Sequence, residues 1–236
     1  MEKVTCGGND MRRFGWVLFV ILFVVFLVKP PVYWELFQKD ANQYKTDTFY
    51  YIIKEEYKED ASGKRLYQPV FSDIQEGDIL VTDSTYCLSF RHGHAALVVD
   101  AARGITLEAF GIGTESEFSR LEEWRRYPHV VVLRLNAPET VRKKVVRYAK
   151  KQLVGIPYML SPGVIDDKDM DGSYWGTQCA HLVWAAFAAC GYDVDGDGGW
   201  LVTPEDFTVS KLLRIVPQGI KKEVSENTKP ETILGK

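Results

Sequence analysis

The chain has 236 residues, of which 46% are hydrophobic and 26% are charged, and its formal net charge is −3. This composition is that of an ordinary globular protein, long enough to bury a core without disulfide staples. A slightly acidic chain lacks the basic footprint of a nucleic-acid-binding protein, so no nucleic-acid partner is expected. The four cysteines, Cys6, Cys87, Cys179 and Cys190, show no C-x-x-C spacing. They therefore give no indication of a zinc ribbon or a redox dithiol.

The N-terminal part of the chain has the features of an anchoring or export segment. Basic residues precede an apolar run over residues 14–28, which two prolines close. The run is somewhat shorter than the roughly 20 residues of a comfortable spanning helix, and no small-x-small cleavage site follows it. Residues 1–31 are therefore expected to be a membrane anchor or a signal segment. Because the basic residues precede the run, the remainder is expected to be extracytoplasmic or secreted.

The rest of the chain divides by composition. Residues 32–70 are polar with scattered aromatics and are expected to form a spacer with a helix or hairpin of its own, in which residues 55–60 predict a solvated helix end. Residues 71–217 have the mixed composition of a globular domain. Residues 218–236 are polar and are expected to be a disordered tail.

Within the globular domain, short apolar runs separated by turns predict antiparallel strands. They lie near residues 79–81, 94–99, 105–110, 130–135 and 212–216. Pro138 opens an amphipathic helix that is expected to run to about residue 153. Thr203, followed by Pro204 and by Asp206 three residues later, is typical of a helix start close to a capping box. This order of elements predicts an α+β fold.

A cysteine stands at the start of a short apolar helix that Gly191 ends. Residues 180–189 contain no glycine, proline or charged side chain, as in a buried helix. A thiol in the first turn lies near unpaired N–H groups and the positive end of the helix dipole, which favour the thiolate. Cys179 is therefore the candidate nucleophile, although a buried structural thiol gives the same pattern.

A cysteine nucleophile needs a base and a group that orients the base. A hairpin centred near residues 100–104 is expected to place His94 across from Glu108, give or take one register step, with both side chains on one face. A carboxylate there fixes the imidazole tautomer and stabilises the imidazolium. His92 is the competing base, but its expected neighbour across the hairpin is Phe110, which is no acid.

The other two histidines are less suited to this task. His181 lies about 200° around the helix axis from Cys179, so it is expected to point away, at the helix surface or the core edge. His129, beside Pro128, is expected to be a loop residue.

Several segments, taken together and in this order, resemble the permuted NlpC/P60 cysteine peptidases of the YiiX/YebB-like group. The similarity covers about residues 75–216 and is carried by residues 76–80, 93–98, 155–158, 179–184, 191 and 203–204. It implies a circularly permuted papain-like fold, in which the histidine strand precedes the cysteine helix and an antiparallel sheet packs on that helix. It also implies hydrolysis of an amide bond, often in cell-wall peptides, by Cys179 and His94 with Glu108 as orienting acid.

The same resemblance bears on substrate and cofactor. Tyr158 follows a Gly-x-Pro as in related enzymes and, with His92, is expected to bind substrate. The substrate would be a peptide or acyl-amide, peptidoglycan included. The implied mechanism needs neither a cofactor nor a metal.

Two acidic segments fit the first half of a calcium loop, at residues 167–172 and 193–198. Where the bidentate glutamate would stand, the first has Gln178 and the second has Pro204, so neither completes the motif. Calcium is therefore not predicted, although the option stays open beside a pair of solvated Asx-rich turns.

Two alternatives to a hydrolase also stay open. One is an acyltransferase or lipid-directed thiol enzyme on the same fold, which a membrane anchor would suit. The other is a non-catalytic binding module, or a metal protein that uses His92, His94 and Cys179.

Overall fold

The structure, a computed structural model, describes the chain from residue 45 to residue 218 with a few short gaps. The described residues are 45–49, 53–68, 70–87, 90–160, 162–163, 167–168 and 175–218. The expected anchor at residues 1–31 and the expected tail lie outside these residues, apart from residue 218 itself. Among the helices of the described part, none has the length and apolar character that crossing a membrane requires.

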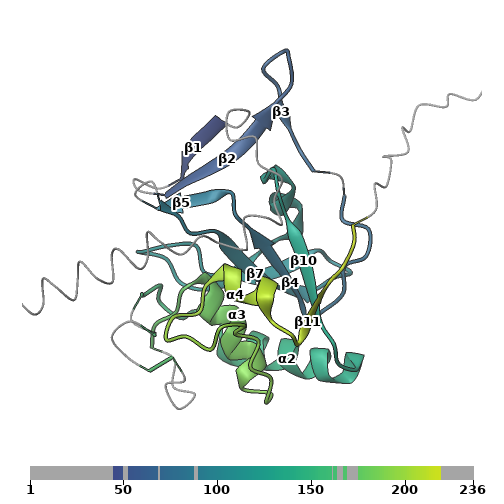
Figure 1. Cartoon of the computed structure of the whole chain (residues 1–236), viewed down its shortest axis with the longest axis vertical. Coiled ribbons are helices and arrows are strands. Elements are labelled where there is room, and N and C mark those ends of the chain that lie inside the picture. Colours follow the sequence, from purple (N-terminus) through teal and green to yellow (C-terminus); the bar gives the residue numbers. More distant parts are fainter. Residues whose placement is uncertain are drawn as a thin grey trace, which may run out of the picture. The chain divides into compact units, whose positions relative to one another are not determined.

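Two antiparallel sheets make up the β part of the described chain (Figure 1). The smaller sheet has the order β1-β2-β5-β6, with β3 paired to β2. Its strands are β1 (Lys45–Phe49), β2 (Ile53–Glu59), β3 (Arg65–Leu66), β5 (Thr85–Cys87) and β6 (Phe90–Arg91). The larger sheet has the order β11-β10-β4-β7-β8-β9. Its strands are β4 (Asp78–Thr82), β7 (His94–Asp100), β8 (Ile105–Glu108), β9 (Glu117–Arg120), β10 (Val131–Leu135) and β11 (Leu213–Ile215).

The helices of the described part are few and short. They are the 3-10 helix η3 (Leu121–Arg126) and the α-helices α2 (Glu139–Gln152), α3 (Cys179–Ala188) and α4 (Pro204–Val209). Helices α2 and α3 contact each other and strand β7, and α4 contacts β4 and β11 (Figure 1). Antiparallel sheets with few helices are compatible with the predicted α+β class.

The centre of the larger sheet forms the core. Strands β4 and β7 are buried almost throughout, as expected of central strands with both faces covered. On one face, Ala96 and Val98 of β7 pack with Trp124 and Tyr127 in one hydrophobic cluster. Side chains two residues apart on a strand share a face, so His94 also belongs to this face.

The expected helix end at residues 55–60 is wrong, because residues 53–59 form strand β2. Glu55 and Glu56 are both buried there. The Glu55 carboxylate accepts hydrogen bonds from Arg126 and from the Tyr127 hydroxyl, at 3.0 and 2.8 Å. Glu56 forms an ion pair with Arg91 at 2.6 Å. These partners are distant in the sequence, so the acidic run by itself indicated a solvated segment. Tertiary ion pairs instead allow two of its glutamates to be buried within a strand.

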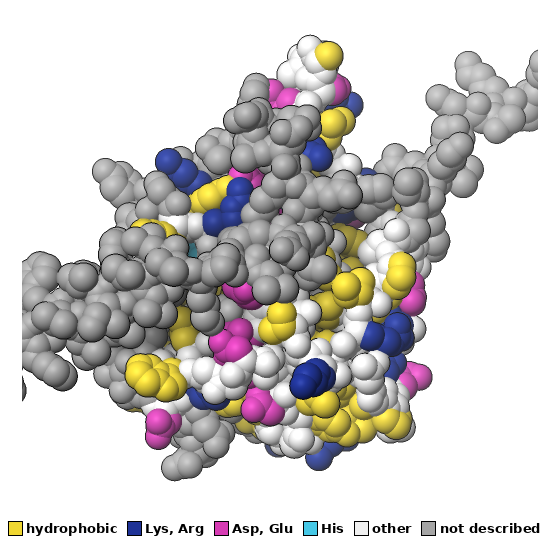
Figure 2. Space-filling view, in the orientation of Figure 1, with side chains coloured by type: hydrophobic (Ala, Val, Ile, Leu, Met, Phe, Trp, Pro, Cys, Tyr) yellow, Lys and Arg dark blue, Asp and Glu magenta, His cyan; other side chains and the backbone are white. Residues whose placement is uncertain are grey.

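The surface carries charges of both signs. Figure 2 shows acidic, basic and hydrophobic side chains interspersed over the described lower part of this face. This mixture is in keeping with a net charge of −3 for the whole chain. Two tryptophans, Trp175 and Trp200, are among the exposed large side chains.

Candidate active site

Cys179 is the first residue of helix α3 and is a buried free thiol. The helix begins there because Gln178 caps it: the Gln178 side-chain oxygen accepts the N–H of Ala180 at 2.8 Å. The other end of the same amide donates to the carbonyl of Val202 at 2.6 Å, which ties the cap to the loop before α4. Gly191, at φ 88°, follows the end of the helix in the left-handed conformation that its sequence position predicts.

The hairpin of β7 and β8 brings His94 and Glu108 together, with a register that differs from the expected one. Leu97 pairs with Leu107 and Val98 with Thr106, and a bulge lies between Val98 and Asp100. Glu108 is therefore in line with Ala96, diagonal to His94, while Phe110 stacks on His94 with ring centroids 5.7 Å apart. A long side chain reaches a diagonal neighbour on the same face. The expected contact forms despite the shift.

His94 Nε2 lies 2.8 Å from Glu108 Oε2, and both side chains are buried. Burial opposes ionisation of Glu108, but the hydrogen bond and positive charge of His94, with hydrogen bonds from Thr106 and Trp124, hold its pKa below the ordinary value. An ionised carboxylate accepts hydrogen bonds only, so the proton of this bond belongs to Nε2. The nitrogen left for another partner is Nδ1.

Cys179 is that other partner of His94. Burial by itself lowers the pKa of His94, but hydrogen bonds with Cys179 and Glu108 and the charges of both groups raise it to about 10. The imidazole is therefore protonated at neutral pH. A protonated imidazole beside a thiol at a helix N-terminus is the arrangement that favours a reactive thiolate.

His92 and Tyr158, the expected substrate-binding residues, both lie close to this pair in the fold. His92 precedes β7 and is separated from His94 by Gly93, whose φ of 72° interrupts the strand. Burial and the charge of His94 lower the pKa of His92 to about 4, so its imidazole is neutral at pH 7. Tyr158 is half-buried and forms a parallel bridge with Thr177, two residues before Cys179.

The structure corrects the prediction for His181. Its imidazole is fully buried. One ring nitrogen lies 2.9 Å from the Thr177 hydroxyl and the other lies 2.8 Å from the carbonyl of Lys168. The side chain is thus bonded to Thr177 and Lys168 in the interior, and it does not lie at the helix surface or the core edge. His129 is half-buried, with Nδ1 3.3 Å from Asp83.

Sequence reasoning missed Trp124, which contacts both members of the buried pair. Its indole N–H donates to Glu108 Oε1 at 3.0 Å, and its ring stacks on the imidazole of His94 with centroids 5.3 Å apart. The available signal was a tryptophan within the charged segment 120–126, because a large apolar side chain between charges marks the buried side of a short helix.

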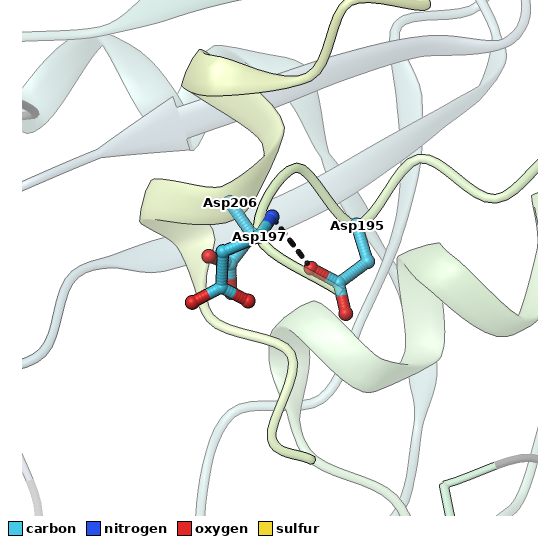
Figure 3. Close-up of side chains that lie close together, drawn as sticks. All are labelled: Asp195, Asp197 and Asp206. Carbon is cyan, nitrogen blue, oxygen red and sulfur yellow. Dashed lines mark hydrogen bonds between the residues drawn. The ribbon is translucent and has the colours of Figure 1, made fainter. Parts of the chain in front are cut away.

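Three aspartates gather at the start of α4. Carboxylate oxygens of Asp195, Asp197 and Asp206 lie within 4.8 Å of one another (Figure 3). It is the one metal-type cluster of His, Cys, Asp or Glu within the described residues. Asp206 belongs to the capping box with Thr203 that the sequence predicted. Residues 169–172 of the first acidic segment lie outside the described residues.

The aspartate cluster fits a metal ion poorly. The ammonium of Lys168 pairs with Asp195 at 2.5 Å. The other oxygen of Asp195 accepts the N–H groups of Asp197 and Gly198, at 3.2 and 3.0 Å. Lys168 thus already supplies positive charge to the cluster, and one Asp195 oxygen is already bonded to two donors. The cluster therefore offers few ligands for a hard cation.

Asp206→Asn should stabilise the protein above about pH 6. Burial, with the charges of Asp197 and Asp195, raises the pKa of Asp206 to about 6 from its ordinary 3.8. Between these values the folded state binds more protons than the unfolded state, so the wild type loses stability as pH rises. Asparagine removes this loss and still accepts the N–H of Thr203. We expect a gain of roughly 1–3 kcal/mol in the free energy of unfolding at pH 7.5.

The measurement is urea unfolding at pH 4, 5 and 7.5 in the presence of a chelator. The gain should shrink as the pH falls toward 4, where the wild-type aspartate is protonated in the folded state. Equal stability of the two proteins at pH 7.5 would show that the three carboxylates do not repel one another.

Comparison with known proteins gives one distant structural likeness. The chain is similar to a crystal structure described as metalloprotein yiiX from Escherichia coli O157:H7, with 18% sequence identity and a TM-score of 0.46. The match covers 65% of this chain and 99% of that chain. Neither a family model nor a curated protein matches the sequence.

Proposed function

We propose that the protein is a thiol hydrolase that cleaves amide bonds, with Cys179 as nucleophile, His94 as acid and base, and Glu108 as the group that orients His94. One observation carries the proposal: a buried histidine lies 2.8 Å from a buried carboxylate, and that carboxylate and the thiol at the start of α3 together raise the pKa of the histidine to about 10. Structural thiols in a core rarely have such partners, whereas cysteine nucleophiles need both.

The reaction follows from these contacts. The Cys179 thiolate attacks the carbonyl carbon, and the negative charge that develops on the carbonyl oxygen is stabilised by the backbone N–H of Cys179 at the helix N-terminus. The protonated His94 gives its proton to the leaving amine, so the C–N bond breaks and a thioester to Cys179 remains. Neutral His94 then takes a proton from water, which attacks the thioester and releases the acid.

The order of the site residues supports the finer assignment to a circularly permuted papain-like enzyme. Strands β7 and β8, which bear His94 and Glu108, precede helix α3, which bears Cys179. This is the order that the resemblance to permuted NlpC/P60 enzymes implies. The proposed substrates are therefore cell-wall peptides or related acyl-amides, met outside the cytoplasm by a protein anchored or secreted through residues 1–31.

The test uses the full-length chain in detergent, with peptidoglycan fragments and simple N-acyl amides as substrates. We expect free amine and acid products, and a transient acyl mass on the peptide that contains Cys179. Cys179→Ala should lose both while its melting temperature changes little, because the substitution is small. Undiminished hydrolysis by Cys179→Ala would contradict the proposal, and acyl transfer to an added amine in place of water would identify an acyltransferase.

A further inference from the structure

The carboxylate that orients His94 is itself held by two neutral donors. Glu108 Oε2 faces His94, while Oε1 accepts the Trp124 indole N–H at 3.0 Å and the Thr106 hydroxyl. Thr106 lies on the same strand and face as Glu108, so its contact is local. Trp124 comes from helix η3, a different element. Of these two donors, Trp124 is therefore the one that ties the carboxylate to another element.

The same indole also holds the imidazole. The rings of Trp124 and His94 stack with centroids 5.3 Å apart and an interplanar angle of 15°. Phe110 stacks on His94 as well, at 5.7 Å and 24°. Stacking on a rigid, buried aromatic ring restricts the rotation of the imidazole about its side-chain bonds. One side chain thus sets both the ring plane of His94 and the position of its carboxylate partner.

Contacts with strand β2 of the smaller sheet hold helix η3 in place. Tyr127, edge-on to Trp124 with centroids 5.3 Å apart, donates its hydroxyl to Glu55 of β2 at 2.8 Å. Arg126 forms an ion pair with the same carboxylate at 3.0 Å. Through Tyr127, the Glu55–Arg126 ion pair thus holds the helix that carries Trp124.

We propose that Trp124 is a positioning residue, which holds the imidazole of His94 and the carboxylate of Glu108 in the one arrangement that turns His94 Nδ1 toward Cys179. This inference rests on the proposed function. Trp124 touches neither the thiol nor, in this role, the substrate. It acts through the two residues that it contacts, by one hydrogen bond and one stacked ring.

The test compares two buried tryptophans that each donate an indole N–H to a carboxylate, that of buried Glu108 for Trp124 and that of exposed Asp193 for Trp184. Trp124→Phe removes the donor to Glu108 and keeps an aromatic ring. Trp184→Phe is the control, because Trp184 is also buried and donates to Asp193 at 2.8 Å, and neither His94 nor Glu108 is its hydrogen-bond partner. The readout is the rate of Cys179 alkylation by iodoacetamide between pH 4 and pH 10 in the full-length chain, with the melting temperature recorded alongside.

Loss of a donor to the charged form raises the pKa of a carboxylic acid. In the alkylation profile, the acid limb is the range of low pH in which the rate falls as Glu108 becomes protonated. In Trp124→Phe, the midpoint of this limb should move up by about half a pH unit or more. The plateau rate above it should fall about tenfold, because His94 is less well aligned. Trp184→Phe should lose melting temperature but keep the wild-type profile. A Trp124→Phe profile that matches the wild type, or an equal shift in both variants, would overturn the proposal.

A measurement on the unmodified protein covers the case in which Trp124→Phe does not fold. In NMR spectra, the Trp124 indole N–H resonance can be identified by its proximity to the His94 ring protons. It should shift with pH at the midpoint of the acid limb. A resonance that does not shift would overturn the proposal. Failure of the proposed function would give a different result: the wild type and His94→Ala would then alkylate Cys179 at the same rate.

Discussion

His94→Ala should reduce turnover about 10²–10⁴-fold and slow the alkylation of Cys179 at neutral pH, because it removes the imidazole that interacts with the thiol. The substitution also leaves Glu108 buried without its main partner, so the negative charge there would further oppose formation of a thiolate. Iodoacetamide labelling followed by peptide mass spectrometry measures the rate at each cysteine separately. In the wild type, Cys179 should react faster than Cys190, whose thiol pKa is raised by burial.

The rate at which Cys179 of the wild type is alkylated should also depend on pH in a way that reports the charge of His94. Because contacts with Cys179 and Glu108 raise the pKa of His94 to about 10, the imidazolium persists through neutral pH and is lost only as the pH approaches 10. An ordinary histidine would lose its proton near pH 6.5. His129→Ala is the control, because His129, although only half-buried, is likewise bonded to a carboxylate, that of Asp83. Equal labelling of Cys179 in wild type and His94→Ala would exclude His94 as its base.

Asp78→Ala should lower the free energy of unfolding by about 3–5 kcal/mol, because it removes the bidentate partner of buried Arg134 and leaves it only the longer contact with the exposed Asp73 carboxylate, at 3.4 Å, and the Asp73 carbonyl. Arg134 binds Asp78 in a bidentate pair, with Nε–Oδ1 and Nη2–Oδ2 distances of 2.6 and 2.8 Å. The two side chains lie across from each other on β10 and β4, and both are buried. Asp78 also accepts the N–H of Gln75 at 2.7 Å, which closes the turn into β4. Urea unfolding at pH 7 measures the loss.

An exposed ion pair supplies the comparison. Glu139 and Lys143 pair at 2.6 Å on the surface of α2 with both side chains more than half exposed, so Glu139→Gln should leave the urea midpoint of unfolding nearly unchanged. Replacing Asp78 and Arg134 together by apolar residues of similar volume should recover much of the loss, because no buried charge is then left alone. A loss below about 1 kcal/mol for Asp78→Ala would show that water reaches Arg134.

Local pattern was sufficient wherever neighbours in the sequence are also neighbours in space. The apolar helix that begins at Cys179, its stop at Gly191 and the capping box of Thr203 and Asp206 all follow from contacts within four residues. The contact between His94 and Glu108 was within reach for a similar reason, since a single tight hairpin joins their strands. The register lies within the one step that the prediction allowed, and the bulge beside it is a local irregularity that apolar alternation does not reveal.

The sequence by itself therefore determined the α+β class, the helix that carries the thiol and the histidine with its carboxylate. Only the tertiary structure decided that residues 53–59 are a strand, that Trp124 meets both His94 and Glu108, and that Asp206 joins Asp195 and Asp197. Each of these depends on a partner at least nine residues away along the chain. Such contacts are set by which faces can be buried together, and no short-range periodicity encodes that choice.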